Sequence, residues 1–161
     1  MIRPAAVADA GYVADIYRYY IEHTTITFEE QPVSTDDMAS RMTYLLGAGH
    51  PWLVAESSEG IVGYAYAGAW KIRSAYRHTM ESTVYLKDGM TGRGLGTALY
   101  TALFEMLTSR HVHAVVGGIA LPNAASVALH EKMGFEKVAH FKETGFKFAR
   151  WIDVGYWERL F

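Results

Sequence analysis

Three glycines alternate with other residues between positions 92 and 96, where a strand-like segment gives way to a helix-like one. Gly92, Gly94 and Gly96 let the backbone approach a ligand closely and adopt conformations that strain other residues. The first amides of the following helix have no partner within it, and the helix dipole favours an anion there. Arg93 can add a charge-assisted hydrogen bond. The pattern predicts a pyrophosphate site over residues 92–97; the alternative is a glycine-rich turn that binds nothing.

The spacing of these glycines separates the segment from two other phosphate-binding loops. A dinucleotide-binding loop follows the pattern G-x-G-x-x-G, whereas this segment reads G-x-G-x-G. A P-loop for nucleoside triphosphates needs Gly-Lys followed by Ser or Thr, which the segment lacks. We therefore disfavour dinucleotides and nucleoside triphosphates as ligands.

A second segment, from Leu121 to Phe135, combines helix-capping residues with polar side chains. Asn123 is the only asparagine of the chain and is suited to begin a helix that Gly134 ends. Capping alone explains both residues. A capping residue at the edge of a cleft can also bind a ligand, so the two interpretations are compatible.

The two segments resemble the acetyl-CoA-binding motifs of the GNAT superfamily of acetyltransferases. Val84-Tyr85-Leu86, then Gly92 to Gly96 and a helix, resembles the family's Gln/Arg-x-x-Gly-x-Gly/Ala motif, although Thr91 stands at the Gln/Arg position. Residues 123–135 resemble a second motif, which runs from an asparagine to Glu-Lys-x-Gly-Phe. The resemblance implies acetyl-CoA as the acetyl donor and a sheet whose strands 79–86 and 114–119 diverge.

The resemblance also implies particular contacts with coenzyme A. Pantetheine would pair with the backbone of Val84, Tyr85 and Leu86 like an added strand. A backbone amide of Tyr85 or Leu86 would hold the oxyanion of the tetrahedral intermediate. Asn123 would bind the pantetheine arm. The other implied contacts with the cofactor are Gly92, Arg93, Gly94, Leu95, Gly96, Thr97, Ser126 and Lys132.

Glu81 is the candidate general base for acetyl transfer to an amine. The ammonium group of the substrate must lose a proton, directly or through water, before its nitrogen can attack. The thiolate leaves readily because the pKa of a thiol is about 8.5. Glu81 precedes Tyr85 on the same predicted strand, beside apolar residues that would raise the pKa of its carboxyl group. The alternative is a solvated carboxylate at a strand edge.

Three further segments resemble a narrower family, the phosphinothricin and methionine sulfoximine N-acetyltransferases. Residues 70–85 are similar to its Arg-x-Ala-Tyr-Arg and Glu-x-Ser/Thr-Val-Tyr pattern, residues 145–153 to Gly-x-Lys-x-x-Arg-Trp-x-Asp, and residues 27–29 to a Thr-Phe-Glu near the start. The resemblance covers nearly the whole chain. It implies a small substrate with an amine, a carboxylate and a phosphinyl or sulfoximine head, and it implies a homodimer.

These segments contain the candidates for substrate binding. Arg73 and Arg77 can each hold an oxyanion through paired hydrogen bonds; the alternative is an ordinary solubilising surface. Aromatic side chains can form the pocket walls or pack in the core, and core packing suits Trp151 better than Trp70; they are Phe28, Trp70, Tyr76 and Trp151. The resemblance extends the substrate-binding set to Glu29, Ala75 and Lys147.

His130 stands where many GNAT members have a tyrosine that protonates the leaving thiolate. A histidine can act as this acid near neutral pH; the alternative is a helix-surface histidine without a role. His111 and His113 alternate near a strand start, but no third ligand is nearby in the sequence, so we predict no metal site. The sequence has no Gly-x-Ser-x-Gly segment that would indicate a serine hydrolase.

Apolar periodicity predicts the elements that must position these residues. Helical spacing marks residues 9–23, 34–46, 95–108 and 122–134. Strand patterns mark residues 52–56, 61–69, 79–86, 114–119, 136–143 and 147–157, and residues 70–78 are expected to form a loop or a short helical turn. The apolar face of the third helix contains Leu95, Ala98, Leu99, Ala102, Leu103, Met106 and Leu107. The order predicts one α/β domain over residues 1–161, with a mixed, splayed sheet of six to seven strands flanked by about four helices.

Composition sets the remaining expectations. The chain has no cysteine, which excludes disulfides, thiolate zinc sites and cysteine nucleophiles. The net charge of −2 provides no basic field for nucleic acid. No apolar run is long enough to span a membrane and no signal-like segment follows Met1, so we expect a cytoplasmic protein.

The leading functional hypothesis is acetyl transfer from acetyl-CoA to the amine of a small amino-acid-like substrate. The amine would attack directly in a ternary complex, with Glu81 as the base. One alternative is an acetyltransferase for another small amine or a protein N-terminus. Another is a module that binds acyl-CoA without catalysis.

Overall fold

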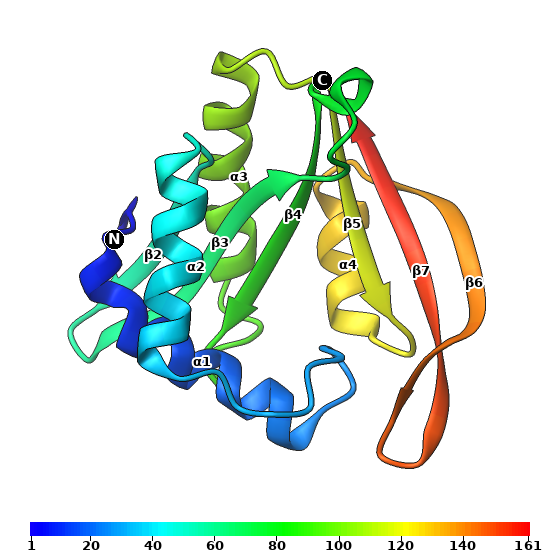
Figure 1. Ribbon diagram of the computed structural model, residues 1–161, viewed down its shortest axis with the longest axis horizontal. Helices are drawn as coiled ribbons and strands as arrows, with labels where there is room; N and C mark the ends of the chain where they lie inside the picture. The colour runs from blue at the N-terminus through cyan, green and yellow to red at the C-terminus, as the bar shows by residue number, and fades with distance from the viewer.

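The computed structural model describes residues 1–161 and shows one mixed sheet with helices on both faces (Figure 1). The strands in chain order are β1 (Ile2–Pro4), β2 (Trp52–Ser57), β3 (Gly60–Ala69), β4 (Thr79–Leu86), β5 (Ala114–Ala120), β6 (Glu136–Lys147) and β7 (Arg150–Leu160). Their spatial order is β1-β2-β3-β4-β5-β7-β6. Only β4 and β5 pair in parallel; all other neighbours are antiparallel. The predicted fold class is confirmed.

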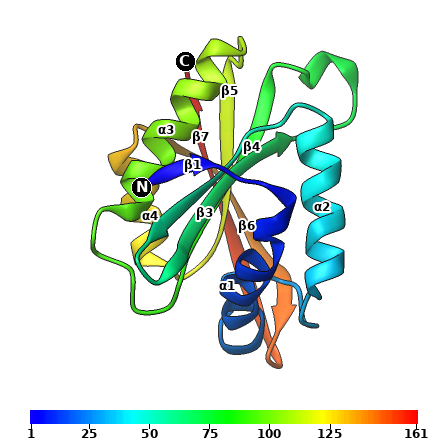
Figure 2. The same ribbon diagram turned by 90° about the vertical axis from the view of Figure 1, so that its left-hand side faces the viewer.

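Four helices cover the sheet, two on each face (Figure 2). They are α1 (Ala10–His23), α2 (Thr35–Gly47), α3 (Leu95–Ser109) and α4 (Ala124–Lys132), with short 3-10 turns η1 (Val7–Asp9) and η2 (Ser74–Tyr76). α1 and α2 lie on one face, and α3 and α4 lie on the other. Ser34 begins α2 as predicted, because its hydroxyl accepts a hydrogen bond from the amide of Asp37. None of the helices combines the length and apolar character needed to cross a bilayer.

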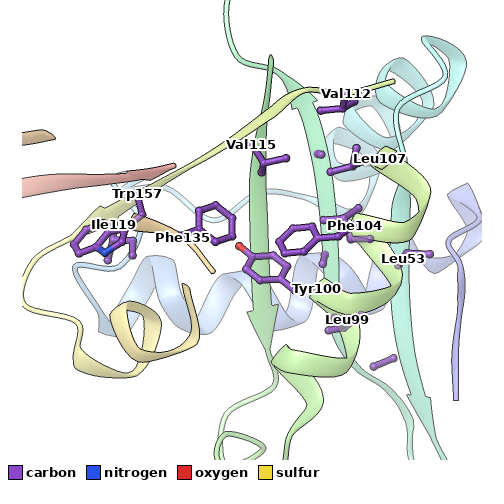
Figure 3. Close-up of a cluster of buried hydrophobic side chains, with 14 of the residues drawn as sticks. Leu53, Leu99, Tyr100, Phe104, Leu107, Val112, Val115, Ile119, Phe135 and Trp157 are labelled. Atoms are coloured by element: carbon purple, nitrogen blue, oxygen red, sulfur yellow. The ribbon is translucent and has the colours of Figure 1, made fainter. Parts of the chain in front are cut away.

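Two hydrophobic cores form because side chains alternate across the sheet. In β2, Leu53 and Ala55 pack toward α3, whereas Trp52 and Val54 pack toward α1 and α2. The α3 core contains the buried side chains labelled in Figure 3. The two cores fix the sheet between its helix layers, so the strand ends that carry functional residues are held on a rigid support.

The buried face of α3 differs from the predicted one. Ala98 is exposed, while Tyr100 and Phe104 are buried. Their rings stack with centroids 5.1 Å apart, and the ring of Tyr100 also stacks on Phe135 at 6.2 Å (Figure 3). The buried face of α3 is therefore shifted from the predicted one. Phe135, which follows α4, covers a second side of the helix.

Strand β6 is longer than predicted, strand β7 has the predicted length but begins and ends three residues later, and the three-residue β1 was not predicted. The strand pattern predicts an end at Glu143, but this residue lies in a bulge within β6, where Glu143 has a φ of 52° and the register with β7 shifts. The hairpin turn lies further on, between Lys147 and Arg150. The prediction that Trp151 packs in the core is wrong. Its side chain is 64% exposed, and its ring lies against Phe146 on the surface.

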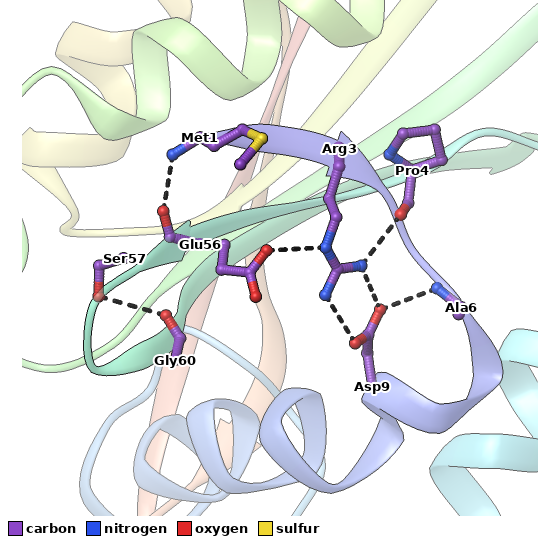
Figure 4. Close-up of polar contacts among 8 residues, drawn as sticks. All are labelled: Met1, Arg3, Pro4, Ala6, Asp9, Glu56, Ser57 and Gly60. Atoms are coloured by element: carbon purple, nitrogen blue, oxygen red, sulfur yellow. Dashed lines mark hydrogen bonds and ion pairs between the residues drawn. The ribbon is translucent and has the colours of Figure 1, made fainter.

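β1 is held by a polar cluster at the N-terminus (Figure 4). The Arg3 guanidinium forms an ion pair with Asp9 at 2.8 Å and with Glu56 at 2.9 Å. The terminal amine donates to the carbonyl of Glu56 at 2.7 Å. Hydrogen bonding to Arg3 lowers the pKa of Asp9. A strand too short to be recognised by its pattern is thus fixed by charges that come together only on folding.

The divergence expected between β4 and β5 is confirmed. The strands pair over only three positions, from Thr79 opposite Ala114 to Glu81 opposite Val116. Beyond Glu81, β4 continues to Leu86 beside β3, and the outer half of β5 pairs with β7. Figure 1 shows the resulting gap, which widens towards the N-terminal end of α4. The sheet therefore opens directly after the predicted base.

Leu103→Ala tests the α3 core. Leu103 is fully buried, so the truncation should lower the free energy of unfolding by about 2–5 kcal/mol, measured by urea denaturation. Glu105→Ala, two residues away on the exposed side of the same helix, is the control and should change it by less than about 0.5 kcal/mol. Equal losses in the two variants would contradict the assigned core.

Candidate active site

Three adjoining cavities follow the open side of the sheet. The cradle cavity, about 390 Å³, lies between the start of α3 and α4. The junction cavity, about 90 Å³, lies where β4 and β5 separate. The inner cavity, about 480 Å³, lies among α1, α2 and the strands. Ile26 and Tyr85 line all three, and Glu81 lines the junction and inner cavities. The series therefore connects the glycine-rich segment with the predicted base.

The glycine-rich segment forms one wall of the cradle cavity. Gly92 and Gly94 have φ values of 76° and 77°, in the left-handed region that favours glycine. Gly94 caps α3, and the amide of Ala98 donates to the carbonyl of Gly94 at 3.0 Å. The amides of Gly96 and Thr97, which precede this bond, have no acceptor within the helix. With the positive end of the helix dipole, they fit the diphosphate of coenzyme A.

α4 forms the opposite wall. Asn123 accepts a hydrogen bond from the amide of Ser126 at 3.1 Å, which begins the helix as the sequence predicted. Asn123, Ser126 and Lys132 all line the cradle cavity, and the ammonium group of Lys132 adds positive charge to it. A Cβ on Gly96 would come within 3.0 Å of Leu129, so this glycine lets α3 and α4 pack closely. Arg93 is exposed and does not line the cavity.

The free edge of β4 forms the floor between the two walls. Val84, Tyr85 and Leu86 all line the cradle cavity. No strand pairs with β4 beyond Glu81 on the β5 side, so backbone groups there are available to an extended ligand. The carbonyl of Leu86 accepts a hydrogen bond from the hydroxyl of Tyr20 at 2.6 Å, which leaves one lone pair for a ligand.

Glu81 is a half-buried carboxylate without a hydrogen-bond or ion-pair partner among the side chains. It is the last residue of β4 that pairs with β5, and it lies between the junction and inner cavities. Burial raises the pKa of its carboxyl group, and the charge of Lys71 partly offsets this. A carboxylate with a raised pKa and free lone pairs is a stronger base than a solvated one. The alternative of a solvated strand-edge carboxylate does not match this burial.

His130 lies in a buried chain of hydrogen bonds, so the alternative that it lies on the helix surface is wrong, and its role stays a prediction. It is 3% exposed, and its Nδ1 lies 2.7 Å from the carbonyl of Ser126. Since a carbonyl can only accept, Nδ1 bears the hydrogen, and Nε2 accepts from the hydroxyl of Tyr100 at 3.1 Å. Ser82 donates in turn to Tyr100 at 3.3 Å. Burial lowers the pKa of His130, so the neutral ring is favoured.

The ring of His130 fits in this position because Gly117, in the middle of β5, has no side chain. A Cβ on Gly117 would lie 2.6 Å from Nε2 of His130, so a larger residue would displace the ring. Glu81, Tyr100 and His130 all line the junction cavity. Two groups that can exchange protons thus face one small space.

Aromatic rings and one ion pair line the inner cavity. Glu29 accepts two hydrogen bonds from Arg41, the shorter at 2.6 Å, and another from the hydroxyl of Tyr17. Hydrogen bonding to Arg41 lowers the pKa of Glu29. Sequence reasoning missed Arg41, because it lies on the polar side of a helix without a motif around it. The aromatic lining consists of Tyr17, Phe28, Tyr44, Trp52, Tyr64, Tyr66 and Tyr85.

Other predicted substrate residues lie outside the three cavities. Arg73, Ala75 and Arg77 are exposed on the segment between β3 and β4, and Trp70 and Tyr76 pack edge to face at 5.4 Å in the same segment. Trp151 and Lys147 are also outside the linings, the first exposed and the second buried. The fold thus brings Phe28, Glu29, Glu81, Tyr85 and His130 together. The substrate roles of the outlying residues stay predictions.

Comparison with known proteins agrees with this geometry. The family model described as an acetyltransferase (GNAT) domain matches residues 2–155. The phosphinothricin N-acetyltransferase of Streptomyces viridochromogenes is 41% identical over 160 residues, covering 99% of this chain and 87% of that protein. The L-methionine sulfoximine/L-methionine sulfone acetyltransferase of Pseudomonas aeruginosa is 38% identical over 157 residues, covering 95% and 90%.

Solved structures are similar over the full chain. A phosphinothricin acetyltransferase from Sinorhizobium meliloti, in complex with acetyl-CoA, has a TM-score of 0.96 and 36% identity, covering 99% of this chain and 87% of that one. A ribosomal-protein-alanine N-acetyltransferase from Brucella melitensis has a TM-score of 0.97 and 34% identity, covering 100% and 99%.

The chain belongs to the GNAT superfamily and is an acetyl-CoA-dependent N-acetyltransferase. Within that class, its similarity to phosphinothricin and methionine sulfoximine N-acetyltransferases extends over nearly the full length, at 33–41% identity. Both resemblances inferred from the sequence are therefore confirmed.

Gly94→Ala tests the cradle, with Gly89→Ala as its matched control. Both glycines have a φ of 77° and open space around the missing Cβ, so each alanine should lower stability by about 1–2 kcal/mol. Only Gly94 lines the cradle cavity. Its variant should bind coenzyme A about tenfold more weakly by calorimetry, the equivalent of about 1.4 kcal/mol. Equal affinities in the two variants would place the diphosphate elsewhere.

Proposed function

We propose that the protein acetylates the amine of a small amino-acid-like substrate such as phosphinothricin or methionine sulfoximine. The observation that carries this proposal is the free, half-buried carboxylate of Glu81 between the junction and inner cavities. The names of the two relatives at 41% and 38% identity support the same substrates. Acetyl-CoA would bind along β4 and the substrate in the inner cavity, so that the amine meets the acetyl group beside Glu81.

The proposed reaction is direct attack in a ternary complex. Acetyl-CoA supplies the activated acetyl group. Glu81 takes a proton from the substrate ammonium, and the freed amine attacks the carbonyl carbon. A backbone amide of Tyr85 or Leu86 holds the oxyanion. When the carbon–sulfur bond breaks, the nitrogen gives up a second proton and the thiolate takes one up, so one proton is released overall.

His130 is the proposed acid for the leaving thiolate. Its neutral ring must first gain a proton at Nε2, and the hydroxyls of Ser82 and Tyr100 form the path to that atom. Because a thiolate leaves with little help, loss of His130 should slow turnover less than loss of Glu81.

A small acid suits the inner cavity better than a peptide does. The inner cavity, at about 480 Å³, is large enough to enclose a whole small amino acid, and its lining combines aromatic rings with the Glu29–Arg41 ion pair. Arg41 uses two of its five N–H donors on Glu29, and the rest are free for a carboxylate or phosphinyl oxygen.

We also propose that the protein forms homodimers and that Arg73 and Arg77 contact substrate bound to the other copy. Both arginines are exposed outside the cavities of their own chain, beside the fully exposed Ile72. Exposed aromatic residues on the β6–β7 hairpin offer an apolar surface for association; they are Phe141, Phe146, Phe148 and Trp151. Mixing Glu81→Gln with Arg73→Ala/Arg77→Ala chains should then restore activity that neither variant has alone.

Glu81→Gln tests catalysis. Removing the base should lower kcat by about 10²- to 10⁴-fold in a thiol-release assay, while calorimetry shows unchanged binding of acetyl-CoA. A protein that binds acyl-CoA without turnover in the wild type would instead be a non-catalytic module. Unchanged turnover in the variant would exclude Glu81 as the base.

The pH dependence of the same residue gives a second test. Because burial raises the pKa of Glu81, kcat/KM should rise with pH through a value above the ordinary carboxyl range. The folded state also favours the protonated form, so ionisation of Glu81 reduces stability as the pH rises through that pKa. Glu81→Gln should therefore raise the Tm relative to wild type at pH 8, and the difference should vanish near pH 4.

The substrate is tested by measuring thiol release across amino acids and their phosphinyl and sulfoximine analogues. We expect turnover of at least one analogue. Turnover of an alanine-initiated peptide or a polyamine alone would favour the alternative acceptors, one of which matches the name of the Brucella melitensis structure.

A further inference from the structure

We propose that Lys147 is a positioning residue: it holds the loop that forms one wall of the inner cavity and so sets how tightly the acceptor binds. The loop comprises residues 24–33, between α1 and α2, and it carries Ile26, Phe28 and Glu29. The inference rests on the proposed function only in naming the acceptor. It differs from a direct contact between Lys147 and the substrate.

Lys147 is a buried cation whose hydrogen-bond partners are all backbone carbonyls, and its ammonium group also lies 5.0 Å from the ring centroid of Phe148. It is 1% exposed, and its ammonium donates to the carbonyl of Thr27 at 2.9 Å and to that of Tyr20 at 3.5 Å. No carboxylate lies within ion-pair distance of it. The carbonyl of Tyr20 belongs to the last turn of α1, where the helix dipole favours a cation. A charge buried in this way is retained at a cost in desolvation, so its position indicates a specific role.

The strand that carries Lys147 lies directly beneath the loop. Side chains alternate along the end of β6, so Gly145 and Lys147 face the loop while Phe146 is 54% exposed. A Cβ on Gly145 would overlap the ring of Phe28, so this glycine allows the loop to rest on the strand. In Figure 1 the tip of the β6–β7 hairpin reaches towards the chain that leaves α1. Two residues of β6 thus fix the loop, one by a hydrogen bond and one by lacking a side chain.

The contact at Thr27 continues into the cavity wall. The hydroxyl of Thr27 lies 2.6 Å from that of Tyr17, and Tyr17 donates in turn to Glu29. Glu29 forms the ion pair with Arg41. Thr27, Tyr17, Glu29 and Arg41 all line the inner cavity. Lys147 therefore determines the position of polar groups that face the acceptor, although it does not touch the cavity itself.

The catalytic groups lie on other elements. Glu81 is on β4 and His130 is on α4, and neither side chain has a hydrogen bond to the 24–33 loop. The cradle is built by the start of α3. Only Ile26 of the loop lines the cradle cavity, whereas four residues of the loop line the inner cavity. Loosening the loop should consequently weaken acceptor binding, change acetyl-CoA binding little and leave the chemical step unchanged.

Lys147→Met is the test, with Lys142→Met as the matched control on an exposed position of the same strand. Loss of a hydrogen bond from a charged group should raise the acceptor KM by about tenfold or more. We expect this rise in Lys147→Met, with kcat and the acetyl-CoA KM within about twofold of wild type, and no change in Lys142→Met. Gly145→Ala, which displaces the loop through Phe28 and keeps the lysine, should give the same pattern.

An unchanged acceptor KM in Lys147→Met, or a loss of kcat with KM unchanged, would overturn the inference. If Gly145→Ala leaves the acceptor KM unchanged while Lys147→Met raises it, the lysine acts on the acceptor and not through the loop. Amide hydrogen exchange of residues 24–33 separates this inference from the proposed function, because it needs no substrate. Faster exchange of this segment in Lys147→Met than in Lys142→Met supports the positioning role even if no amino acid is acetylated, and equal exchange contradicts it.

Discussion

The end of parallel pairing between β4 and β5 is the constraint on which the rest of the site depends. The two strands share hydrogen bonds only as far as Glu81, and beyond that residue each is paired on one side alone. Unpaired backbone in a protein interior must find other partners. Here it borders the cradle and junction cavities, so the proposed acetyl-CoA site, the proposed base and the proposed acceptor site adjoin one another where the sheet opens.

Glycines let the helices approach this opening. The left-handed glycines at the start of α3 leave its first amides facing the cradle, and Gly96 brings α4 close enough to form the opposite wall. Gly117 leaves room for the ring of His130 beside the junction cavity. At each of these glycines a side chain would strain the backbone, push the two helices apart or displace a neighbouring ring. Gly145 likewise leaves room for the ring of Phe28, which belongs to the loop that forms one wall of the inner cavity.

Electrostatic environment gives the ionisable groups of the site different properties. Glu81 is half-buried and unpartnered, so its pKa rises, whereas Glu29 is paired with Arg41 and its pKa falls. One carboxylate is thereby suited to accept a proton, and the other stays ionised as part of the cavity wall. His130, enclosed and hydrogen-bonded through both nitrogens, is held neutral. The division of roles follows from burial and partners and not from residue type.

The sequence by itself determined the fold class, most element positions, the glycine-rich start of α3 and the candidate base. These depend on local rules: glycine spacing, helix caps and apolar periodicity. Only the tertiary structure decided that Arg41 pairs with Glu29 across 12 residues, that His130 is buried against Tyr100, and that Lys147 lies outside the cavity. It also turned a predicted strand end near Glu143 into a bulge. Such facts depend on which distant segments pack together, and no local pattern records them.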